Sequence, residues 1–255
     1  MLVELPDEAR LPSWSPDGRW LAFQHFVEGQ WRIFVIGRDG KGLRQLTSGA
    51  ADDREPVWTA DGKALLFSSD RSGNFDIWKV AASGGTPERI TSATADEYFP
   101  AVSADGRIAF VSATAKGRDL VVREASGDRV LLSSPDELAL PSWSKRGDRL
   151  AYVEYRRGRP GRDPGSSAIN VVTIATGTAT RQSGETEDVF VTRPQWAAEN
   201  TLLYTADGKI RQRSGTRASD IHFAAEFTVM RVPEYRYKRQ DFFSANPRAV
   251  KGIVA

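Results

Sequence analysis

Hydrophobic and polar positions alternate with a period of two in short stretches of the chain. In residues 20–24, WLAFQ, the first, third and fifth side chains share one face, and the second and fourth share the other. This alternation predicts a β-strand. Two tight-turn sequences, SPDG at 15–18 and RDG at 38–40, separate this strand from its neighbours. The strands predicted for the unit cover residues 12–14, 20–24, 31–36 and 43–47.

The whole unit recurs along the chain. The opening phrase PSWSPDGRWLAF is followed by four related copies, and the leading prolines lie 44, 44, 41 and 53 residues apart. A repeat near this length, with four short strands and a turn in each copy, is typical of β-propeller blades. The fold prediction is therefore all-β: a propeller of four-stranded antiparallel blades with five recognisable repeats, which leaves open an incomplete six- or seven-bladed ring. The blades begin near Pro12, Pro56, Pro100, Pro141 and Pro194.

The later copies are less regular. The fourth carries an insertion at residues 156–167 between its second and third strands, which we expect to form a loop on one face. In the fifth copy we expect the third strand at residues 209–213 and the fourth at 223–231. We therefore divide the chain into propeller repeats at 1–205, followed at 206–255 by the rest of the last blade and a basic tail or linker.

Two residue types recur with the repeat. Tryptophans occupy one position in four copies, where we expect them to pack between blades. Aspartates occupy the turn of the first three copies, where a carboxylate can accept hydrogen bonds from the backbone ahead. The residues are Trp14, Trp58, Trp143, Trp196, Asp17, Asp61 and Asp105.

Composition excludes several classes of chemistry. The chain has no cysteine, which excludes disulfides, thiol nucleophiles and cysteine-ligated metals. Its 35 basic and 33 acidic residues imply no strongly charged partner overall. The N-terminal residues lack the pattern of a signal peptide, and no apolar run reaches the roughly 20 residues that span a bilayer. We therefore expect no membrane insertion.

No catalytic or cofactor motif is present. The two histidines, His25 and His222, have no partner at metal-ligand spacing, and we expect His25 to lie in a surface loop. The sequence contains no G-x-S-x-G elbow, P-loop or G-x-G-x-x-G. The basic tail mixes arginine with tyrosine at residues 231–239, but no nucleic-acid motif accompanies it. We therefore assign no catalytic residue, no metal, no cofactor and no nucleic-acid partner.

The residues just before each leading proline are the best candidates for a binding site. They lie where the chain begins the innermost strand of a blade, so we expect them to surround one end of the central channel. Acidic and basic groups are mixed there with an aromatic ring, which suits a peptide or protein segment. The predicted rim residues are Arg10, Arg54, Glu55, Glu97, Tyr98, Glu137 and Arg193.

The repeats resemble those of the TolB-type propeller family, whose units read P-x-W-S-P-D-G-x-x-[IL]-A-[FY], followed by I-x-[VW] and a [LI]-T ending. The segments WTADG, SSDRSGNFDIWKV and GGTPERIT at residues 58–62, 68–80 and 84–91 are particularly close. The resemblance covers roughly residues 12–205. The segment at 227–255 resembles the stretch that propeller-containing amidohydrolases carry in their N-terminal propeller region, just before another SPDG repeat.

Two functions follow from this resemblance. The first is a non-catalytic module that binds or scaffolds protein or peptide partners, with a periplasmic or other extracytoplasmic location. The alternative is the N-terminal propeller fragment of a larger hydrolase, an amidohydrolase or a prolyl oligopeptidase-like peptidase, in which it would gate access to a downstream domain. The second expectation treats the chain as part of a longer protein.

Overall fold

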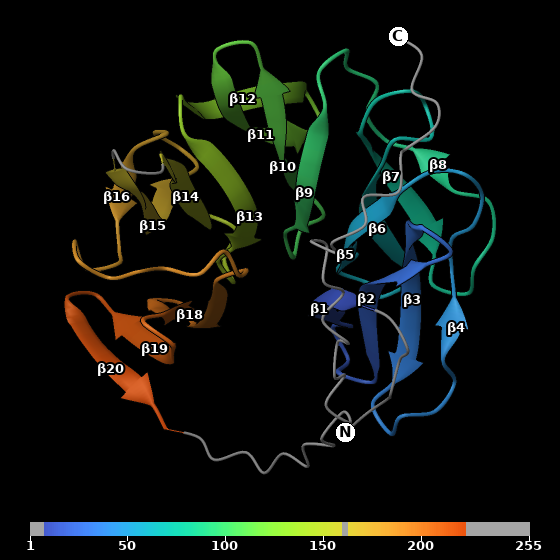
Figure 1. The fold of residues 1–255 in the computed structure, drawn as a ribbon, viewed down its shortest axis with the longest axis horizontal. Coiled ribbons are helices and arrows are strands. Elements are labelled where there is room, and N and C mark those ends of the chain that lie inside the picture. The colour runs from blue at the N-terminus through green and yellow to red at the C-terminus, as the bar shows by residue number, and fades with distance from the viewer. Residues whose placement is uncertain (1–7, 160–162, 223–255) are drawn as a thin grey trace, which may run out of the picture. The chain divides into compact units, whose positions relative to one another are not determined.

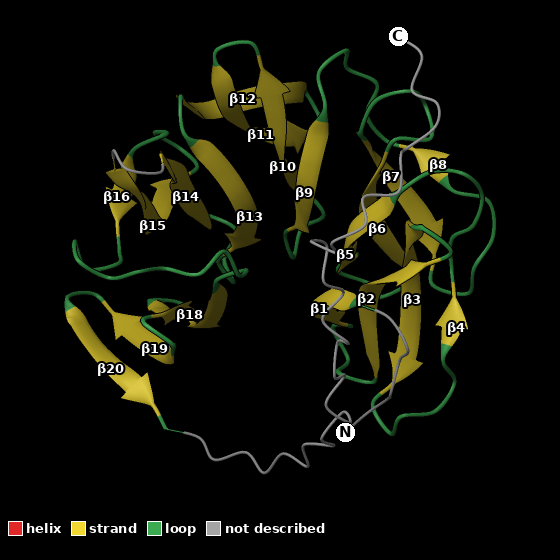
Figure 2. Ribbon diagram, viewed as in Figure 1, coloured by secondary structure: helices red, strands yellow, loops and turns green. Residues whose placement is uncertain are grey.

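The computed structural model describes residues 8–159 and 163–222, which form five separate β-sheets. Each sheet contains four antiparallel strands in chain order and is one blade. Figure 1 shows the blades following one another around a ring. No helix occurs among the described residues (Figure 2), and so none of them belongs to a helix that could cross a bilayer. The predicted all-β propeller with five blades is confirmed.

The blades are numbered in chain order. Blade 1 contains β1 (Ala9–Trp14), β2 (Trp20–Val27), β3 (Gln30–Gly37) and β4 (Arg44–Gln45). Blade 2 contains β5 (Asp53–Trp58), β6 (Ala64–Ser69), β7 (Asp76–Ala81) and β8 (Glu88–Arg89). Blade 3 contains β9 (Glu97–Val102), β10 (Ile108–Thr114), β11 (Gly117–Glu124) and β12 (Gly127–Ser134). Blade 4 contains β13 (Glu137–Trp143), β14 (Arg149–Arg159), β15 (Asp163–Thr173) and β16 (Ala179–Arg181). Blade 5 contains β17 (Gln195–Ala198), β18 (Thr201–Ala206), β19 (Lys209–Ser214) and β20 (Arg217–Ile221).

The first strand of each blade lies innermost, and β1, β5, β9, β13 and β17 contact one another in succession. In blades 1 to 4 the pairing of this strand with the second is broken by a β-bulge. The residue directly before the leading proline has a left-handed backbone there, with φ between 51 and 62°. A bulge re-aims the side chain that it carries. These residues are Leu11, Glu55, Phe99 and Leu140, and the corresponding residue of blade 5 is Arg193, which precedes β17.

The repeated turns are closed by their own side chains. The Asp17 carboxylate accepts hydrogen bonds from Ser15 Oγ at 2.6 Å and from the Arg19 N–H at 3.0 Å. Asp61 repeats this geometry with Thr59 Oγ1 at 2.6 Å and the Lys63 N–H at 3.0 Å. These hydrogen bonds hold the pKa of both carboxyl groups below the ordinary value. The prediction that the repeated aspartates are turn residues is confirmed.

Four clusters of buried hydrophobic side chains lie between consecutive blades. Phe67 lies in the cluster between blades 1 and 2, and Phe110 lies in the cluster between blades 2 and 3. Leu150 and Tyr204 lie in the clusters between blades 3 and 4 and between blades 4 and 5. Within the part of the chain that the structure describes, no such cluster joins blade 5 to blade 1. Burial at the four joints is therefore what holds the blades in order.

The repeated tryptophans follow this arrangement. Trp58 and Trp143 are only 7% and 8% exposed, and Trp196 is partly buried. Each of the three donates its indole N–H to a backbone carbonyl of the preceding blade. Trp14 is 50% exposed, so the expectation of packing between blades holds for three positions and is wrong for Trp14.

Three sequence predictions need correction. The described parts of the insertion, residues 156–159 and 163–167, do not form a loop, because they extend β14 and β15 as paired strands. The fourth strand of blade 5 is β20, and the predicted range 223–231 lies outside the described residues. His25 is 3% exposed within β2, where its Nδ1 lies 3.0 Å from the Glu8 carbonyl oxygen and its ring packs against Phe34.

Candidate functional site

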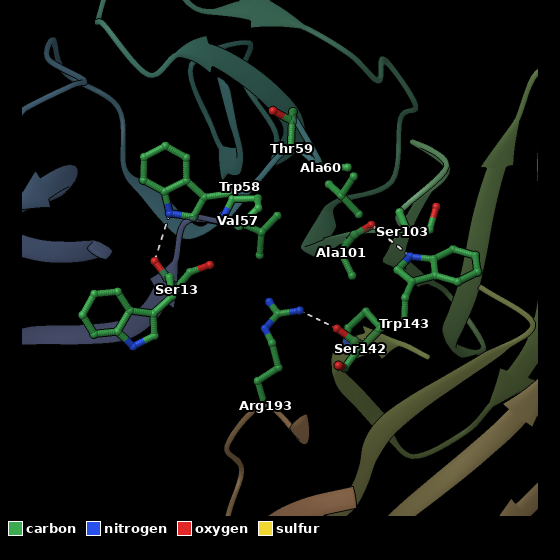
Figure 3. A pocket seen from close by; sticks show the side chains of 15 residues that line it. Ser13, Val57, Trp58, Thr59, Ala60, Ala101, Ser103, Ser142, Trp143 and Arg193 are labelled. Atoms are coloured by element: carbon green, nitrogen blue, oxygen red, sulfur yellow. Dashed lines mark hydrogen bonds between the residues drawn. The ribbon is translucent and has the colours of Figure 1, made fainter. Parts of the chain in front are cut away.

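A pocket of about 350 Å³ lies where the five blades meet (Figure 3). Blades 1 to 4 contribute the ends of their innermost strands and the turns that follow, and blade 5 contributes the residue before β17. We call it the turn-end pocket. Its volume is at the lower end of the roughly 300–1,000 Å³ usual for ligand sites. One lining residue from each blade is Ser13, Val57, Ala101, Ser142 and Arg193.

Indole rings form part of the pocket wall, and the N–H groups of two of them already donate hydrogen bonds to backbone carbonyls. Trp58 Nε1 donates to the Ser13 carbonyl at 3.0 Å, and Trp143 Nε1 donates to the Ala101 carbonyl at 3.3 Å (Figure 3). These bonds fix the two rings at the pocket wall, where most of their surface is buried between blades. Trp14, the exposed tryptophan, also lines it.

Arg193 brings a positive charge into the pocket. Its guanidinium points into the space between the innermost strands (Figure 3), and its Nη1 donates to the Pro141 carbonyl. Desolvation in the channel lowers the pKa of Arg193 to about 10, and the nearby Glu55 carboxylate opposes this shift. Among the described residues that line the pocket, Arg193 is the one with a charge.

Glu55 is buried beside the channel and connects three blades. Its Oε2 accepts hydrogen bonds from Ser68 Oγ of its own blade at 2.7 Å and from the Phe99 N–H of blade 3 at 2.6 Å. Its backbone N–H donates to Gln24 Oε1 of blade 1 at 2.8 Å. Burial raises the pKa of Glu55, against the opposing effect of these hydrogen bonds and of the Arg193 charge.

The other predicted rim residues on blades 1 and 2 form local pairs. Arg10 is exposed and donates from Nε to Glu8 Oε1 at 2.6 Å. Arg54 pairs with Asp52 at 2.5 Å, and its guanidinium lies over the Phe75 ring.

Two of the remaining rim residues, on blades 3 and 4, contact the preceding blade. Tyr98 packs against Phe75 with ring centroids 4.9 Å apart, and burial raises the pKa of Tyr98 to about 12. Glu137 pairs with Arg118 at 2.9 Å, and Glu97 is buried. Of the seven predicted residues, Glu55 lies within electrostatic reach of Arg193, Arg54 and Tyr98, and Arg193 is the one of these that lines the turn-end pocket.

Sequence reasoning missed the residues that follow each leading proline. Val57, Ala101 and Ser142 occupy this position and line the turn-end pocket. Their signal is the repeat itself, because each lies one residue beyond the proline that opens a blade. The pocket therefore lies further along the innermost strands than the predicted rim. Within residues 8–159 and 163–222, no group of three or more histidine, aspartate or glutamate side chains could hold a metal ion.

Comparison with known proteins identifies the family. Residues 1–137 match the TolB beta propeller domain family. The chain belongs to this family. A stretch of 37 residues is 49% identical to the Tol-Pal system protein TolB of Syntrophus aciditrophicus (strain SB), and it covers 14% of this chain and 8% of that protein.

Solved structures share the fold of this TolB beta propeller domain. TolB from Acinetobacter baumannii superposes with a TM-score of 0.67 at 18% identity, over 84% of this chain and 54% of that one. A putative TolB from Agrobacterium tumefaciens gives a TM-score of 0.70 at 15% identity, over 86% and 82%. A puromycin-hydrolyzing peptidase from Mycobacterium tuberculosis gives 0.56 at 20% identity, over 79% and 35%. This TolB beta propeller domain thus spans about half the length of the A. baumannii protein.

Ionisation of the buried Glu97 side chain lowers the stability of this TolB beta propeller domain as the pH rises. Its carboxyl group is buried, its Oε2 has no hydrogen-bond partner among the described residues, and the Asp76 carboxylate is nearby. Burial, reinforced by Asp76, raises the pKa of Glu97 above its ordinary value of 4.5. The folded state therefore holds this proton more tightly than the unfolded state, and stability falls as the pH rises from 4.5 through the folded-state pKa.

We therefore expect Glu97→Gln to raise the free energy of unfolding by about 1–3 kcal/mol at pH 8, since it removes a buried unsatisfied charge. The gain should vanish near pH 4, where both states are protonated. Urea unfolding at the two pH values measures it. Glu137→Gln is the matched control, because it removes a half-buried ion pair worth about 0–1 kcal/mol and should not stabilise at either pH. A gain for Glu97→Gln that is equal at both pH values would contradict this account.

Proposed function

We propose that this propeller is a non-catalytic module that binds a protein or peptide partner through the turn-end pocket. The observation that carries the proposal is the composition of the pocket, to which all five blades contribute. Its walls combine aromatic and aliphatic side chains with backbone edges, and one guanidinium faces the space. Such a mixture suits an extended peptide segment, because such a segment carries both apolar and polar side chains.

The likeness to the Tol-Pal system protein TolB supports this function over an enzymatic one. The same likeness supports a location outside the cytoplasm, in an assembly of the cell envelope. The partner would then be another protein of that assembly.

A second candidate is the propeller domain of a larger hydrolase. The fold likeness to the puromycin-hydrolyzing peptidase favours it, because this chain covers 35% of that protein. In such a protein the propeller would control which substrates reach a separate catalytic domain. The mass of the native polypeptide in its source cells separates the two candidates. A band near 28.1 kDa on an immunoblot would favour the binding module, and a much larger band would favour the hydrolase.

Blocking the pocket tests the proposed function. Ala60 is exposed and lines the turn-end pocket, so Ala60→Trp should fill it without disturbing the core. Linear peptides selected from a phage-displayed library on the parent chain should bind this variant at least about tenfold more weakly, a loss of about 1.4 kcal/mol. Isothermal titration calorimetry gives the two dissociation constants.

Ala115→Trp is the control for added bulk, because Ala115 is exposed in the turn between β10 and β11. It should leave peptide binding unchanged. If the selected peptides bind Ala60→Trp as tightly as the parent, the turn-end pocket is not their site and the proposed function fails.

A further inference from the structure

The charge of Arg193 is balanced only in part, through the Glu55 carboxylate, with which it forms no ion pair. No carboxylate among the described residues lies within ion-pair distance of its guanidinium, and its hydrogen bond goes to the neutral Pro141 carbonyl. Glu55, the acidic group that acts on it electrostatically, has its Oε2 occupied by Ser68 and Phe99. A cation held in a desolvated channel without a partner costs stability, which is typical of a ligand-binding group.

The free edge of the guanidinium has a definite geometry. Nη1 is used by Pro141, while Nε and Nη2, on the other edge, have no hydrogen-bond partner within the described part of the chain. That edge presents two parallel N–H groups. Two parallel donors match the two oxygens of a carboxylate in a bidentate pair.

The rest of the pocket offers few competing polar groups. The carbonyls of Ser13, Ala101 and Ser142 accept the indole N–H groups of three tryptophans. The hydroxyls of Thr59 and Ser103 are held by the turn aspartates. The hydroxyls of Ser13 and Ser142 and the Trp14 indole N–H also line the pocket, but Arg193 is the one charged group among the described lining residues, so a doubly charged phosphate would find a single cation here. A singly charged carboxylate attached to an apolar group fits this environment better.

We propose that the turn-end pocket binds a carboxylate carried on an apolar group, with the Nε and Nη2 edge of Arg193 as its receptor. The inference rests on the proposed function and specifies the chemistry of its peptide partner. The carboxylate comes either from a peptide C-terminus or from an aspartate or glutamate side chain. Both present the same two oxygens to Arg193, and the experiment distinguishes them.

The test uses the whole chain and three small probes. N-acetylphenylalanine represents a C-terminal carboxylate, N-acetylphenylalaninamide is its neutral counterpart, and N-acetylaspartate N-methylamide represents an acidic side chain. Binding is followed by tryptophan fluorescence, since Trp58 and Trp143 line the pocket, and by calorimetry. We expect at least one of the two carboxylates to bind about tenfold or more tightly than the neutral amide, and the tighter of the two identifies the source.

Variants of Arg193 test whether its guanidinium causes the preference for a carboxylate over the neutral amide. Arg193→Gln should abolish the difference between carboxylate and amide, and Arg193→Lys, which keeps the charge but loses the bidentate edge, should reduce it several-fold. Arg38→Gln removes an exposed charge in the turn after β3 and should leave the preference intact. Circular dichroism checks that Arg193→Gln is folded at the temperature of the binding experiment.

Two results would overturn the inference. One is equal binding of the carboxylates and the amide to the parent, including no binding of any probe. The other is a carboxylate preference that survives in folded Arg193→Gln. These results leave the proposed function standing if the selected peptides still lose affinity for Ala60→Trp, so the two failures are distinguishable.

Discussion

Replacing Trp58 with alanine should lower the free energy of unfolding by about 3–5 kcal/mol, whereas replacing Trp14 should lower it by less than about 1 kcal/mol. The two residues occupy the same position of the repeat. Trp58 is 7% exposed, packs in the cluster between blades 1 and 2, and donates its indole N–H to Ser13. Trp14 is 50% exposed, and its indole N–H donates no hydrogen bond to any described residue. Truncation therefore leaves a cavity at Trp58 and removes mostly solvated surface at Trp14.

Urea unfolding followed by far-ultraviolet circular dichroism measures both variants, because this signal does not depend on the tryptophan removed. Each variant is then the control for the other, since the chemical change is identical. Equal losses of stability would mean that the two tryptophans make equivalent contacts, and that Trp14 is covered in solution as Trp58 is.

This contrast shows what the repeat could and could not predict. The strands, turns and tryptophan positions follow from local patterns that recur with the period, and the structure contains them. The burial of a tryptophan depends on whether a blade packs against it, which the motif does not encode. The same limit explains His25, whose place at a strand end predicted exposure, although the Glu8 carbonyl and Phe34 enclose it. The insertion at 156–167 is rich in arginine, glycine and proline and predicted a loop, but pairing of β14 with β15 outweighed that composition.

The binding site was predicted only in part, because the position of a residue relative to the leading proline decides where its side chain lies. Glu55 and Arg193 directly precede a leading proline, and these two reach the channel. Arg54 and Tyr98 lie two residues before the proline, and Glu97 lies three before it. The Arg54 side chain contacts groups of its own blade, and the side chains of Tyr98 and Glu97 lie near Phe75 and Asp76 of the preceding blade. At Glu55 the bulge re-aims the side chain, whereas Arg193 precedes β17 and is not among the residues with a positive φ. The bulge requires a left-handed backbone at a residue other than glycine, which sequence patterns do not announce.

Glu55→Ala should lower the free energy of unfolding by about 3–5 kcal/mol, because it breaks a buried network that joins three blades. The Phe99 N–H and the Ser68 hydroxyl would lose their acceptor, and Arg193 would lose the one carboxylate that acts on it. Glu55→Gln keeps an acceptor oxygen in the same place and should stay within about 1 kcal/mol of the parent. The left-handed backbone at residue 55, with φ 62°, is unfavourable for alanine and glutamine as it is for glutamate, so it does not contribute to the difference between the variants.

The pH dependence separates the role of the Glu55 charge from that of its hydrogen bonds. Burial raises the folded-state pKa of Glu55, so the folded state prefers the protonated form. The contribution of Glu55 to stability should then fall as the pH rises above its ordinary value of 4.5. Glu55→Gln, which cannot ionise, should therefore compare more favourably with the parent at pH 8 than at pH 5. Urea unfolding of the parent and both variants at these two pH values gives the comparison.

If Glu55→Ala lowers the free energy of unfolding no more than Glu55→Gln does, the hydrogen bonds to Phe99 and Ser68 do not hold the blades together. If the glutamine variant shows the same change with pH as the parent, the Glu55 carboxyl group is not what titrates.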